Sequence, residues 1–382
     1  MEYTTIGESC SVVSGGTPSR SKNEYWIDGT IPWIKIGNIK SKYVNEYDEL
    51  ITEKGLNNSS AKLLEKGTIL YTIFATLGEV GILDIEACTN QAIAGITIND
   101  SRITTDYLYY YLKSKKDYVN NIGRGVAQNN INLTTLKKFE IPLIDINKQL
   151  NIVKALEKSE ELIALKKKEI DDLDLLIKAR FIEMFGDLKS NEKDWDLKTF
   201  EEMSVLITDG EHSTPKRTKE GIYLLSARNI LNHSLQLKDV DYINRDEYLR
   251  IAKRVVPKKG DILISCSGTI GRCCSVPDSL QLQMVRSVAL IRFKEVINPI
   301  FAEYMITSDY LQEQINSSKT MSSQANLFQG KIRKLKGFLP PTELQQQFAD
   351  FVRQVDKSRE EVKKSLEKTQ QLYDSLMQEY FG

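Results

Sequence analysis

The chain has 382 residues, of which 41% are apolar and 27% are charged, with 52 basic and 52 acidic side chains. This length exceeds what one hydrophobic core usually supports, so we expect at least two domains. The sequence has no apolar run long enough to cross a bilayer, and its start lacks the layout of a signal peptide. These features argue against a membrane protein and predict a cytoplasmic one.

The formal net charge of zero argues against a simple polyanion binder, because proteins that neutralise phosphates usually carry a basic excess. The charge is nevertheless sorted along the chain. Residues 113–138 contain six basic residues and one acidic residue, and residues 250–259 contain five basic and no acidic residues. Residues 157–174 instead contain seven acidic and four basic residues. Two basic segments therefore remain candidate contacts for nucleic acid.

Residues 1–146 contain short β-rich runs separated by Gly, Asn and Pro, with one helical pattern near TTDYLYYYLKSKKDYV. This texture predicts a first globular domain. Over residues 147–185 Gly and Pro disappear and apolar residues recur every seven positions. The members of this stripe are Leu156, Ile163, Ile170, Ile177 and Met184, broadened by Val153, Leu173 and Leu176. Such a stripe, bordered by Lys and Glu, predicts a long helix with a coiled-coil seam.

The same two sequence patterns, a β-rich segment and then a long helical segment, occur again in the second half. Residues 186–342 predict a second globular domain, and residues 343–382 predict a second long helix. Its apolar positions are Leu344, Phe348, Phe351, Val355, Val362, Leu366, Leu372, Leu376 and Tyr380, and the polar residues Ser358 and Thr369 interrupt them as register-setting residues would. Two long helices in one chain most simply pack on each other. An antiparallel pair would relate the halves by an approximate two-fold axis, with one domain at each end.

The chain also repeats its own phrases in the same order. KGTILYTIFATLGEVG begins at Lys66, and KGDILISCSGTIGRCC begins at Lys259. The further matches are Thr17-Pro18 with Thr214-Pro215, Asn38-Ile39 with Asn229-Ile230, Gln128 and Asn130 with Gln324 and Asn326, Pro142 with Pro340, Gln149 with Gln347, and EMFG with EYFG. Matches in register at about half the chain length predict a tandem duplication.

The second copy of the phrase contains a turn rich in glycine and hydroxyl groups, from Ser267 to Arg272. Backbone N–H groups of such a turn can hold a phosphate, but the turn lacks the ending of a P-loop, and a hairpin turn is an equal alternative. The only histidines are His212 and His233, both in the second half, and no zinc-protease, nuclease or amino-methylating motif is found. We therefore expect a protein that binds rather than a catalyst.

The five cysteines are an odd number, and Cys266, Cys273 and Cys274 cluster in one copy of the repeated phrase. A disulfide framework is therefore not expected. Because the sequence has no C-x-x-C pair and few histidines, a structural role for these thiols is favoured over metal binding.

Three features favour DNA as the ligand. Basic and hydroxyl residues crowd the turn-rich segments, amide side chains lie beside basic ones, and the halves share framework phrases but differ between them. Asn and Gln can bridge adenine edges and Arg can bridge guanine, whereas solvated loops and Asx turns are the alternative roles. The candidate contacts of the first half are Thr17, Ser19, Arg20, Lys22, Lys35, Asn38, Thr76, Arg124, Gln128, Asn129 and Asn130. Those of the second half are Thr214, Lys216, Arg217, Arg228, Asn229, Ser267, Thr269, Arg272, Lys319, Gln324 and Asn326.

Several motifs occur twice in the same order: a GxTP loop, a phrase ending in Asn-Ile, KGxILxxxxxTxG, an amide-rich segment, and a Pro before a Gln-bearing helix. In these motifs the chain resembles the specificity subunit of type I restriction-modification systems. The resemblance covers essentially the whole chain. It implies an α+β protein with two pseudo-repeated α/β target-recognition domains separated by a long antiparallel two-helix coiled coil. Each domain would read one half of a split, asymmetric site in double-stranded DNA.

The resemblance also implies the partners. The helices would recruit two methyltransferase subunits, and restriction subunits that translocate DNA would join them. S-adenosylmethionine, ATP and Mg would act in those partners, so no cofactor is expected on this chain. The alternatives are an enzyme acting on nucleic acid and a cytosolic coiled-coil scaffold, of which the second leaves the two basic segments unexplained.

Overall fold

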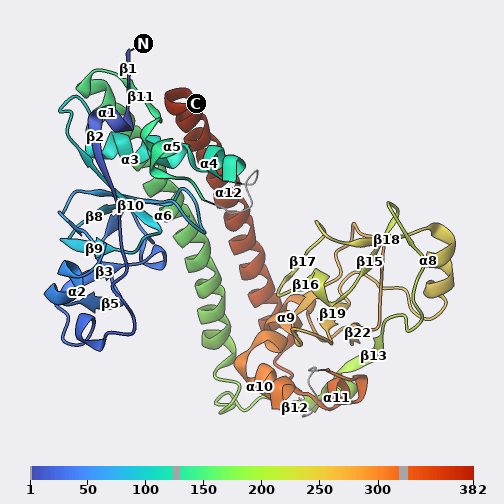
Figure 1. Ribbon diagram of the computed structural model, residues 1–382. Helices are drawn as coiled ribbons and strands as arrows, with labels where there is room; N and C mark the ends of the chain where they lie inside the picture. Colours follow the sequence, from blue (N-terminus) through green and yellow to red (C-terminus); the bar gives the residue numbers. More distant parts are fainter. Residues whose placement is uncertain (1, 124–129, 318–325) are drawn as a thin grey trace. The chain divides into compact units, whose positions relative to one another are not determined.

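A computed structural model describes residues 2–123, 130–317 and 326–382 of the chain (Figure 1). The chain divides into two compact units, one made of Met1–Lys167 with Lys364–Gly382 and the other of Lys168–Lys363. Two helices of 40 residues, α6 (Ile146–Phe185) and α12 (Thr342–Phe381), contribute one half to each unit. We call the part of the chain before α6 domain 1 and the part between α6 and α12 domain 2.

Domain 1 is built on two sheets and one further strand pair. The larger sheet has the order β2 (Cys10–Ser14), β10 (Ile93–Ile98), β7 (Ile69–Thr72), β8 (Val80–Leu83) and β4 (Tyr43–Val44). The second has the order β5 (Glu49–Ile51), β3 (Ile31–Ile34), β9 (Ala87–Thr89) and β6 (Leu63–Leu64), and β1 (Glu2–Thr5) pairs with β11 (Glu140–Leu143). The helices are α1 (Ile6–Ser9), α2 (Glu53–Asn57), α3 (Thr105–Ser114), α4 (Lys116–Gly123) and α5 (Leu133–Lys137).

Domain 2 repeats this plan. One sheet has the order β13 (Ser204–Asp209), β22 (Val288–Phe293), β19 (Ile262–Ser265) and β20 (Cys273–Ser275). The other has the order β14 (Arg217–Thr218), β18 (Asp241–Ile243), β15 (Ile222–Leu225) and β21 (Leu282–Met284). The remaining pairs are β12 (Leu197–Thr199) with β23 (Lys336–Phe338) and β16 (Ile230–Leu231) with β17 (Ser234–Leu235). The helices are α7 (Phe200–Met203), α8 (Arg245–Ala252), α9 (Pro299–Thr307), α10 (Asp309–Ser317) and α11 (Gln329–Lys334).

Equivalent strands of the two domains pair in the same way. The order β2-β10-β7-β8 recurs as β13-β22-β19-β20, and the parallel pair of β3 with β9 recurs as β15 with β21. Even short elements recur, because α1 and α7 begin with the same capping box, made by Thr5 and Glu8 in one copy and by Thr199 and Glu202 in the other. At least six helices and strands recur in the same order, so the structure contains the duplication that the repeated phrases predict.

The repeated phrase itself forms an interior strand of equivalent sheets in the two domains, β7 and β19, and the turn that follows. All four residues of β7 and all four of β19 are buried, as expected of a strand covered on both faces. Gly78 and Gly271 then adopt φ angles of 80° and 85°, a conformation that side chains disfavour. A Cβ at Gly271 would also lie 2.9 Å from Gln312 of α10. The glycine of the phrase is therefore explained by the backbone of the turn.

The long helices run antiparallel within each unit. In the first unit Leu156 and Ile163 of α6 share a core with Tyr373 and Phe381 near the end of α12. In the second unit the end of α6, with Phe181, packs against the beginning of α12 in a different core. The α+β fold with two domains and a two-helix coiled coil is thus confirmed.

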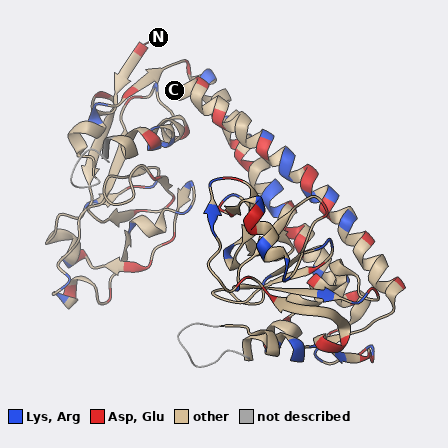
Figure 2. Cartoon of the chain, turned by 90° about the vertical axis from the view of Figure 1, so that its right-hand side faces the viewer, with Lys and Arg blue, Asp and Glu red and all other residues tan. Residues whose placement is uncertain are grey.

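Lys, Arg, Asp and Glu alternate along the exposed sides of the long helices (Figure 2). No helix in the described ranges is long and apolar enough to cross a membrane.

The expected seam is wrong at three positions. Leu176 and Leu372 have 48% and 54% of their surface exposed, and Ser358 is also exposed. A straight helix turns every 3.6 residues, so a strict seven-residue repeat drifts off the contact line. In α12 the buried contact position is Tyr373 and not the expected Leu372, so the seam is shifted by one residue there. Ser358 is therefore not a register-setting residue of the seam.

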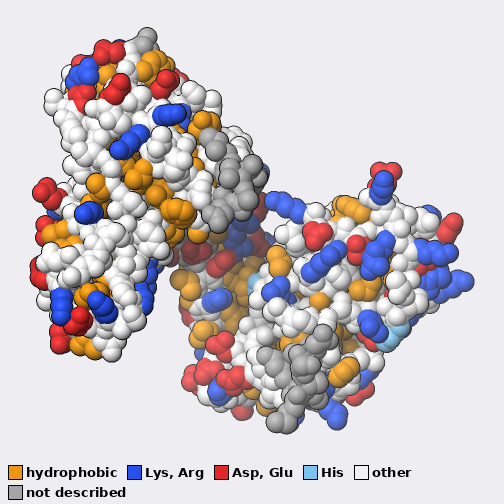
Figure 3. Space-filling model, in the orientation of Figure 1, with side chains coloured by type: hydrophobic (Ala, Val, Ile, Leu, Met, Phe, Trp, Pro, Cys, Tyr) orange, Lys and Arg blue, Asp and Glu red, His pale blue; other side chains and the backbone are white. Residues whose placement is uncertain are grey.

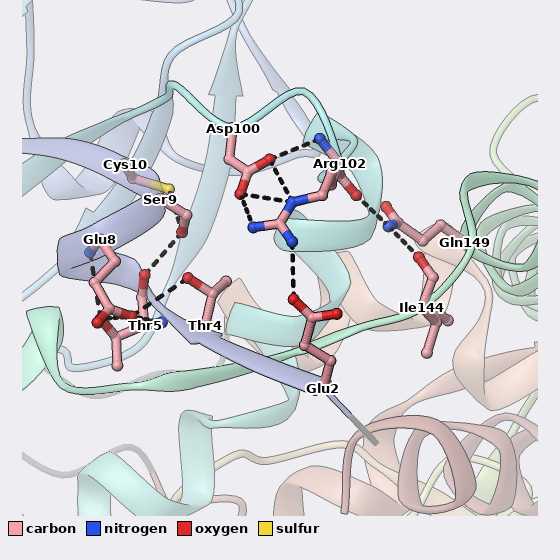
Figure 4. Close-up of polar contacts among 10 residues, drawn as sticks. All are labelled: Glu2, Thr4, Thr5, Glu8, Ser9, Cys10, Asp100, Arg102, Ile144 and Gln149. Carbon is pink, nitrogen blue, oxygen red and sulfur yellow. Dashed lines mark hydrogen bonds and ion pairs between the residues drawn. The ribbon is translucent and has the colours of Figure 1, made fainter.

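Each long helix is fixed to its domain by one buried glutamine near its start (Figure 4 shows Gln149). Gln149 is fully buried, its Oε1 accepts from the Thr104 N–H at 3.0 Å, and its Nε2 donates to the carbonyls of Arg102 and Ile144 at 2.6 and 3.0 Å. The equivalent residue in the other copy is Gln345. We call each such set of three hydrogen bonds a glutamine joint.

Gln345, also fully buried, accepts from the Asn298 N–H at 2.8 Å and donates to the carbonyls of Val296 and Pro340 at 3.1 and 2.8 Å. The expected match of Gln149 with Gln347 is therefore wrong by two residues, because Gln347 is exposed. The match of Pro142 with Pro340 is wrong by the same step, since Pro340 supplies the carbonyl that Ile144 supplies in the first copy.

Glu160 of α6 joins three elements of the first unit. It accepts from the hydroxyls of Tyr110 (α3) and Tyr373 (α12) at 2.8 and 2.9 Å and pairs with Lys113 at 2.5 Å. Burial alone would raise the pKa of Glu160, but the charge and hydrogen bond of Lys113 and the two hydroxyls outweigh burial and lower the pKa. The carboxylate is therefore favoured in the folded state.

Because the pKa of Glu160 is lowered by folding, its contribution is present above the unfolded value of about 4.3 and is lost as pH falls through the lower, folded value. We expect Glu160→Gln to reduce the free energy of unfolding by about 1–3 kcal/mol at neutral pH, since two hydroxyls and an ammonium lose a charged acceptor. Denaturant unfolding at pH 7 and pH 3.5 measures this. The difference between wild type and variant should shrink at the lower pH, and an equal difference at both pH values would contradict the assignment.

Candidate nucleic-acid interface

Two separate segments of domain 1 meet at the strand β5. Arg20, in the loop after β2, places Nη2 2.7 Å from Oε2 of Glu49 and Nη1 3.2 Å from Oε1. Lys35, directly after β3, places Nζ 3.8 Å from the same carboxylate and 3.6 Å from Asp48. We call Arg20, Lys35 and Glu49 the first cation cluster. Two of the residues expected to contact DNA are thus brought together.

Two tryptophans orient Arg20. Its guanidinium carbon lies 3.6 Å from the ring centroid of Trp26 and 4.9 Å from that of Trp33, a cation–π arrangement. The indole N–H of Trp33 donates to the carbonyl of Gly16 at 2.9 Å, and that of Trp26 donates to the carbonyl of Ser19 at 3.2 Å. The loop that carries Arg20 is therefore tied to both rings.

Domain 2 also contains an acid that is contacted by two cations. Arg217 of β14 places Nε 2.9 Å from Oδ2 of Asp241, and Arg228 places Nη2 3.4 Å from Oδ1. We call these three residues the second cation cluster. Asp241 stands opposite Leu224 of β15, as Glu49 stands opposite Trp33 of β3, so the two acids occupy equivalent places.

The second cation of the cluster is attached at a different backbone position in the two domains. Lys35 precedes the turn Ile36–Asn38, whereas Arg228 lies inside the equivalent turn Ala227–Asn229. Both nevertheless reach the acid on the neighbouring strand. The spatial arrangement is therefore common to both domains although the aligned residues differ.

Asn130 and Asn326, the described residues of the amide-rich segments, lie beside the glycine turns, as the repeated order suggests. Asn130 forms an isolated antiparallel bridge with Phe74, and Asn326 forms one with Ser267. The backbone N–H of the next residue extends each bridge, from Ile131 to the carbonyl of Ile73 at 3.1 Å and from Leu327 to that of Cys266 at 2.9 Å. Thr76 and Thr269, at the exposed tips of the turns, lie next to this bridge.

A cavity of about 750 Å³ in domain 2 gathers four candidate residues from three segments of the chain. Thr214, Arg217, Ser267 and Asn326 all line it. The lining also contains His212, Arg286, Phe328 and Gln329 together with the acids Asp209 and Glu211. Figure 3 shows Lys and Arg side chains gathered over the part of domain 2 that contains α8. The lining is thus rich in polar side chains and includes one exposed aromatic ring, Phe328.

The remaining candidates have local contacts. Thr17 donates to the side chain of Gln91, Ser19 bonds to Ser21 at 2.9 Å, and Lys22 donates to the Tyr25 hydroxyl at 2.9 Å. The backbone N–H of Lys216 donates to Glu247 at 3.1 Å, which leaves its exposed ammonium outside that bond. Arg272 is half-buried, and its backbone N–H donates to the Ser265 hydroxyl at 3.0 Å.

Asn38 and Asn229 have a structural role within their domains, and a contact of either residue with DNA stays a prediction. Asn38 is 4% exposed, and Asn229 is fully buried. Each side-chain carbonyl accepts from a backbone N–H three residues earlier, at Lys35 and Ser226, both at 2.9 Å. Each amide group donates within the same domain, from Asn38 to Asp48 and from Asn229 to the carbonyls of Gln236 and Asp239. Both residues hold the turn that carries a cation, as Asx turns do.

Five candidates, Arg124, Gln128, Asn129, Lys319 and Gln324, lie outside the described residues.

The clustered cysteines are buried in domain 2, and so are the other two cysteines in domain 1. Burial raises the pKa of all three thiols of the cluster, to about 12 for Cys266, so they are held as neutral apolar groups. Cys273 donates to the carbonyl of Glu303 at 3.6 Å. Across the described ranges, His, Cys, Asp and Glu side chains form no group of three or more that could hold a metal ion.

Sequence reasoning missed the acids Glu49 and Asp241 and the ring of Trp26. Both acids begin a short strand that pairs with the strand before the cation-bearing turn. Their partners are 29 and 24 residues away in the sequence, so no local pattern connects them. The only signal was an acid at nearly the same distance after the Asn-Ile turn of each half, 11 residues after Asn38 and 12 residues after Asn229.

The chain is similar to known proteins over nearly its whole length. The family model described as "Type I restriction modification DNA specificity domain" matches residues 1–175 and again 192–371. The MjaIX specificity subunit of Methanocaldococcus jannaschii is 34% identical over 189 residues, which cover 48% of this chain and 43% of that subunit. The EcoR124I/EcoR124II specificity subunit of Escherichia coli is 29% identical over 42% of this chain and 41% of that subunit. These alignments therefore span less than half of those relatives.

Other likenesses extend further. The EcoprrI specificity subunit of Escherichia coli is 22% identical over 90% of this chain and 85% of its own length. A crystal structure of the S subunit of a type I system from M. genitalium covers 100% of this chain and 96% of that one, with a TM-score of 0.56 and 16% identity. A chain from a structure of a type I R-M system gives a TM-score of 0.67 at 15% identity, covering 100% and 97%. With its domain matched twice and its fold shared with solved S subunits, the chain belongs to the family of type I restriction-modification DNA specificity proteins.

Proposed function

We propose that this chain is the DNA-recognition subunit of a type I restriction-modification complex, in which each domain reads one half of a bipartite, asymmetric site. The observation that carries the proposal is the pair of cation clusters. Each of two equivalent domains presents two cations from separate segments at the same strand. Two similar but non-identical readers on one chain suit a site made of two different halves.

The side chains available suit base reading as well as phosphate contact. Arg20, Arg217 and Arg228 carry planar donors that match the major-groove edge of guanine, and Asn130 and Asn326 carry the amide groups that match adenine. Exposed hydroxyls at Thr76, Thr214 and Thr269 suit phosphate oxygens. The neutral net charge fits a subunit whose partners supply further contacts to the backbone of DNA.

The long helices would dock the two methyltransferase subunits. Helix α6 exposes several large apolar side chains, namely Leu150, Leu162, Leu165, Leu175, Leu176 and Ile182, each with at least 41% of its surface accessible. Apolar groups that a helix exposes in such number are typical of a surface that another protein covers. The restriction subunits that translocate and cleave DNA would join through this core complex.

In this proposal the chain itself is not catalytic and binds no cofactor. Methylation with S-adenosylmethionine and cleavage driven by ATP and Mg would belong to the partner subunits. The complex would act in the cytoplasm, where it meets double-stranded DNA.

A footprinting experiment tests the proposal. The chain, purified with its methyltransferase subunits, is incubated with a library of duplexes, and the bound sequences are selected and footprinted. We expect protection of two short specific segments separated by a gap whose sequence is free, because two domains read two half-sites. Binding with no sequence preference would contradict DNA reading, and assembly with the methyltransferase without any DNA binding would favour the scaffold alternative.

A further inference from the structure

We propose that Glu49 and Asp241 are positioning residues, which hold the cations of each domain in the orientation that discriminates bases. The inference rests on the proposed function and assigns a role to two acidic residues at a surface meant for a polyanion. A carboxylate at such a place repels phosphates, so its presence needs a compensating effect. Orientation of a guanidinium is such an effect.

The geometry of the first cluster fixes one side chain in two ways. The carboxylate of Glu49 receives both Nη groups of Arg20, at 2.7 and 3.2 Å, which sets the plane of the guanidinium. Trp26 stacks on that plane at 3.6 Å. An end-on fork uses two of the five N–H donors of arginine and leaves three for a base edge. The hydrogen bond from Arg20 also lowers the pKa of Glu49, so the carboxylate is ionised at neutral pH.

The acid also permits two cations to lie close together. Arg20 and Lys35 both reach the same oxygen of Glu49, at 2.7 and 3.8 Å, so two positive groups share one carboxylate. Like charges on neighbouring flexible side chains repel each other and tend to move apart. A shared carboxylate replaces that repulsion with two attractions.

The second cluster reaches the same result with different chemistry. Asp241 is one methylene shorter than Glu49, it receives Nε of Arg217 rather than a fork, and its second cation is Arg228. Both acids stand at equivalent register positions of β5 and β18. A carboxylate shared by two cations is thus built twice from different residues, and in each cluster the second cation also pairs with another acid, Lys35 with Asp48 and Arg228 with Asp239. That repetition argues against an accidental surface ion pair, which typically contributes little.

The test measures discrimination separately from affinity. Glu49→Gln and Asp241→Asn remove the charge and keep the shape. Glu24→Gln and Asp278→Asn are matched controls, because each acid pairs with one lysine, Lys54 or Lys259, in the same domain as the test residue. The chain with its methyltransferase subunits is titrated against four duplexes, namely the selected site, the site with either half scrambled, and an unrelated sequence.

We expect Glu49→Gln to reduce discrimination against one scrambled half by about tenfold, and Asp241→Asn to do so for the other half. Binding to the unrelated duplex should be unchanged or tighter, since a negative charge is removed. Glu49→Asp should restore most of the discrimination, because an aspartate suffices in the second cluster. The thermal midpoint of each variant should stay within a few degrees of wild type.

Several results would overturn the inference. Unchanged discrimination with tighter binding to every duplex would mean that the acids only repel DNA. Loss in both halves from either single variant, or loss in the controls, would mean a general effect on folding. These outcomes differ from failure of the proposed function, in which the unmodified chain would itself bind all four duplexes equally.

Discussion

Arg20→Ala is expected to weaken binding to the cognate site by roughly tenfold to a hundredfold, and Arg217→Ala is expected to do the same through the other half-site. Each substitution removes a planar donor that can bridge a base, a contact of about 1–3 kcal/mol. Arg20→Ala also removes the stacking on Trp26. Because the two residues belong to different domains, their losses should add in the double variant.

Titration against the selected site at several salt concentrations measures this. Base contacts change the affinity for one sequence, whereas a phosphate contact weakens all sequences and lowers the salt slope by about one. Arg102→Ala is a suitable control, because its partners Glu2 and Asp100 belong to neither cluster. If Arg20→Ala reduced recognition of both half-sites equally, the residue would support the fold and not the reading of bases.

Gln149→Ala and Gln345→Ala should each reduce the free energy of unfolding by about 2–5 kcal/mol. The reason is that each glutamine joint satisfies one backbone N–H and two carbonyls beside a fully buried side chain, and alanine leaves these groups unpaired. The effect is therefore larger than the loss of one exposed hydrogen bond.

Gln347→Ala is the internal control for this prediction. Gln347 lies two residues from Gln345 on the same helix but is exposed, so alanine there should change the stability by less than about 0.5 kcal/mol. Denaturant unfolding followed by circular dichroism compares the three variants. Similar losses at Gln345 and Gln347 would contradict the assignment of the joint.

Much of the fold was accessible from the sequence because its signals are local or repeated. The absence of Gly and Pro over residues 147–185, with apolar residues at helical spacing, predicts α6 without knowledge of its surroundings. The repeated phrase at Lys66 and Lys259 predicts two equivalent domains, since each copy folds into the same strand and turn. The role of these helices as a spacer between the domains stays a prediction.

The details that failed depend on burial. Three consecutive glutamines, residues 345–347, offer three matches for Gln149, and only the packed structure decides that the first is inside. The sequence also does not show that Asn38 and Asn229 are buried by the turn they stabilise. The acids of the cation clusters could not be found, because strand pairing brings them from a distant segment. Individual DNA contacts remain predictions.

The glutamine joints have a consequence for how such chains change. Beside their apolar contacts, both helices bind their domains through equivalent backbone groups, one N–H and two carbonyls, whose positions depend on main-chain geometry. A domain with entirely different loops can therefore be grafted at this point, provided that its backbone presents one donor and two acceptors. The hydrogen bonds that attach each domain to its helix therefore set no requirement on the sequence of the domain's loops.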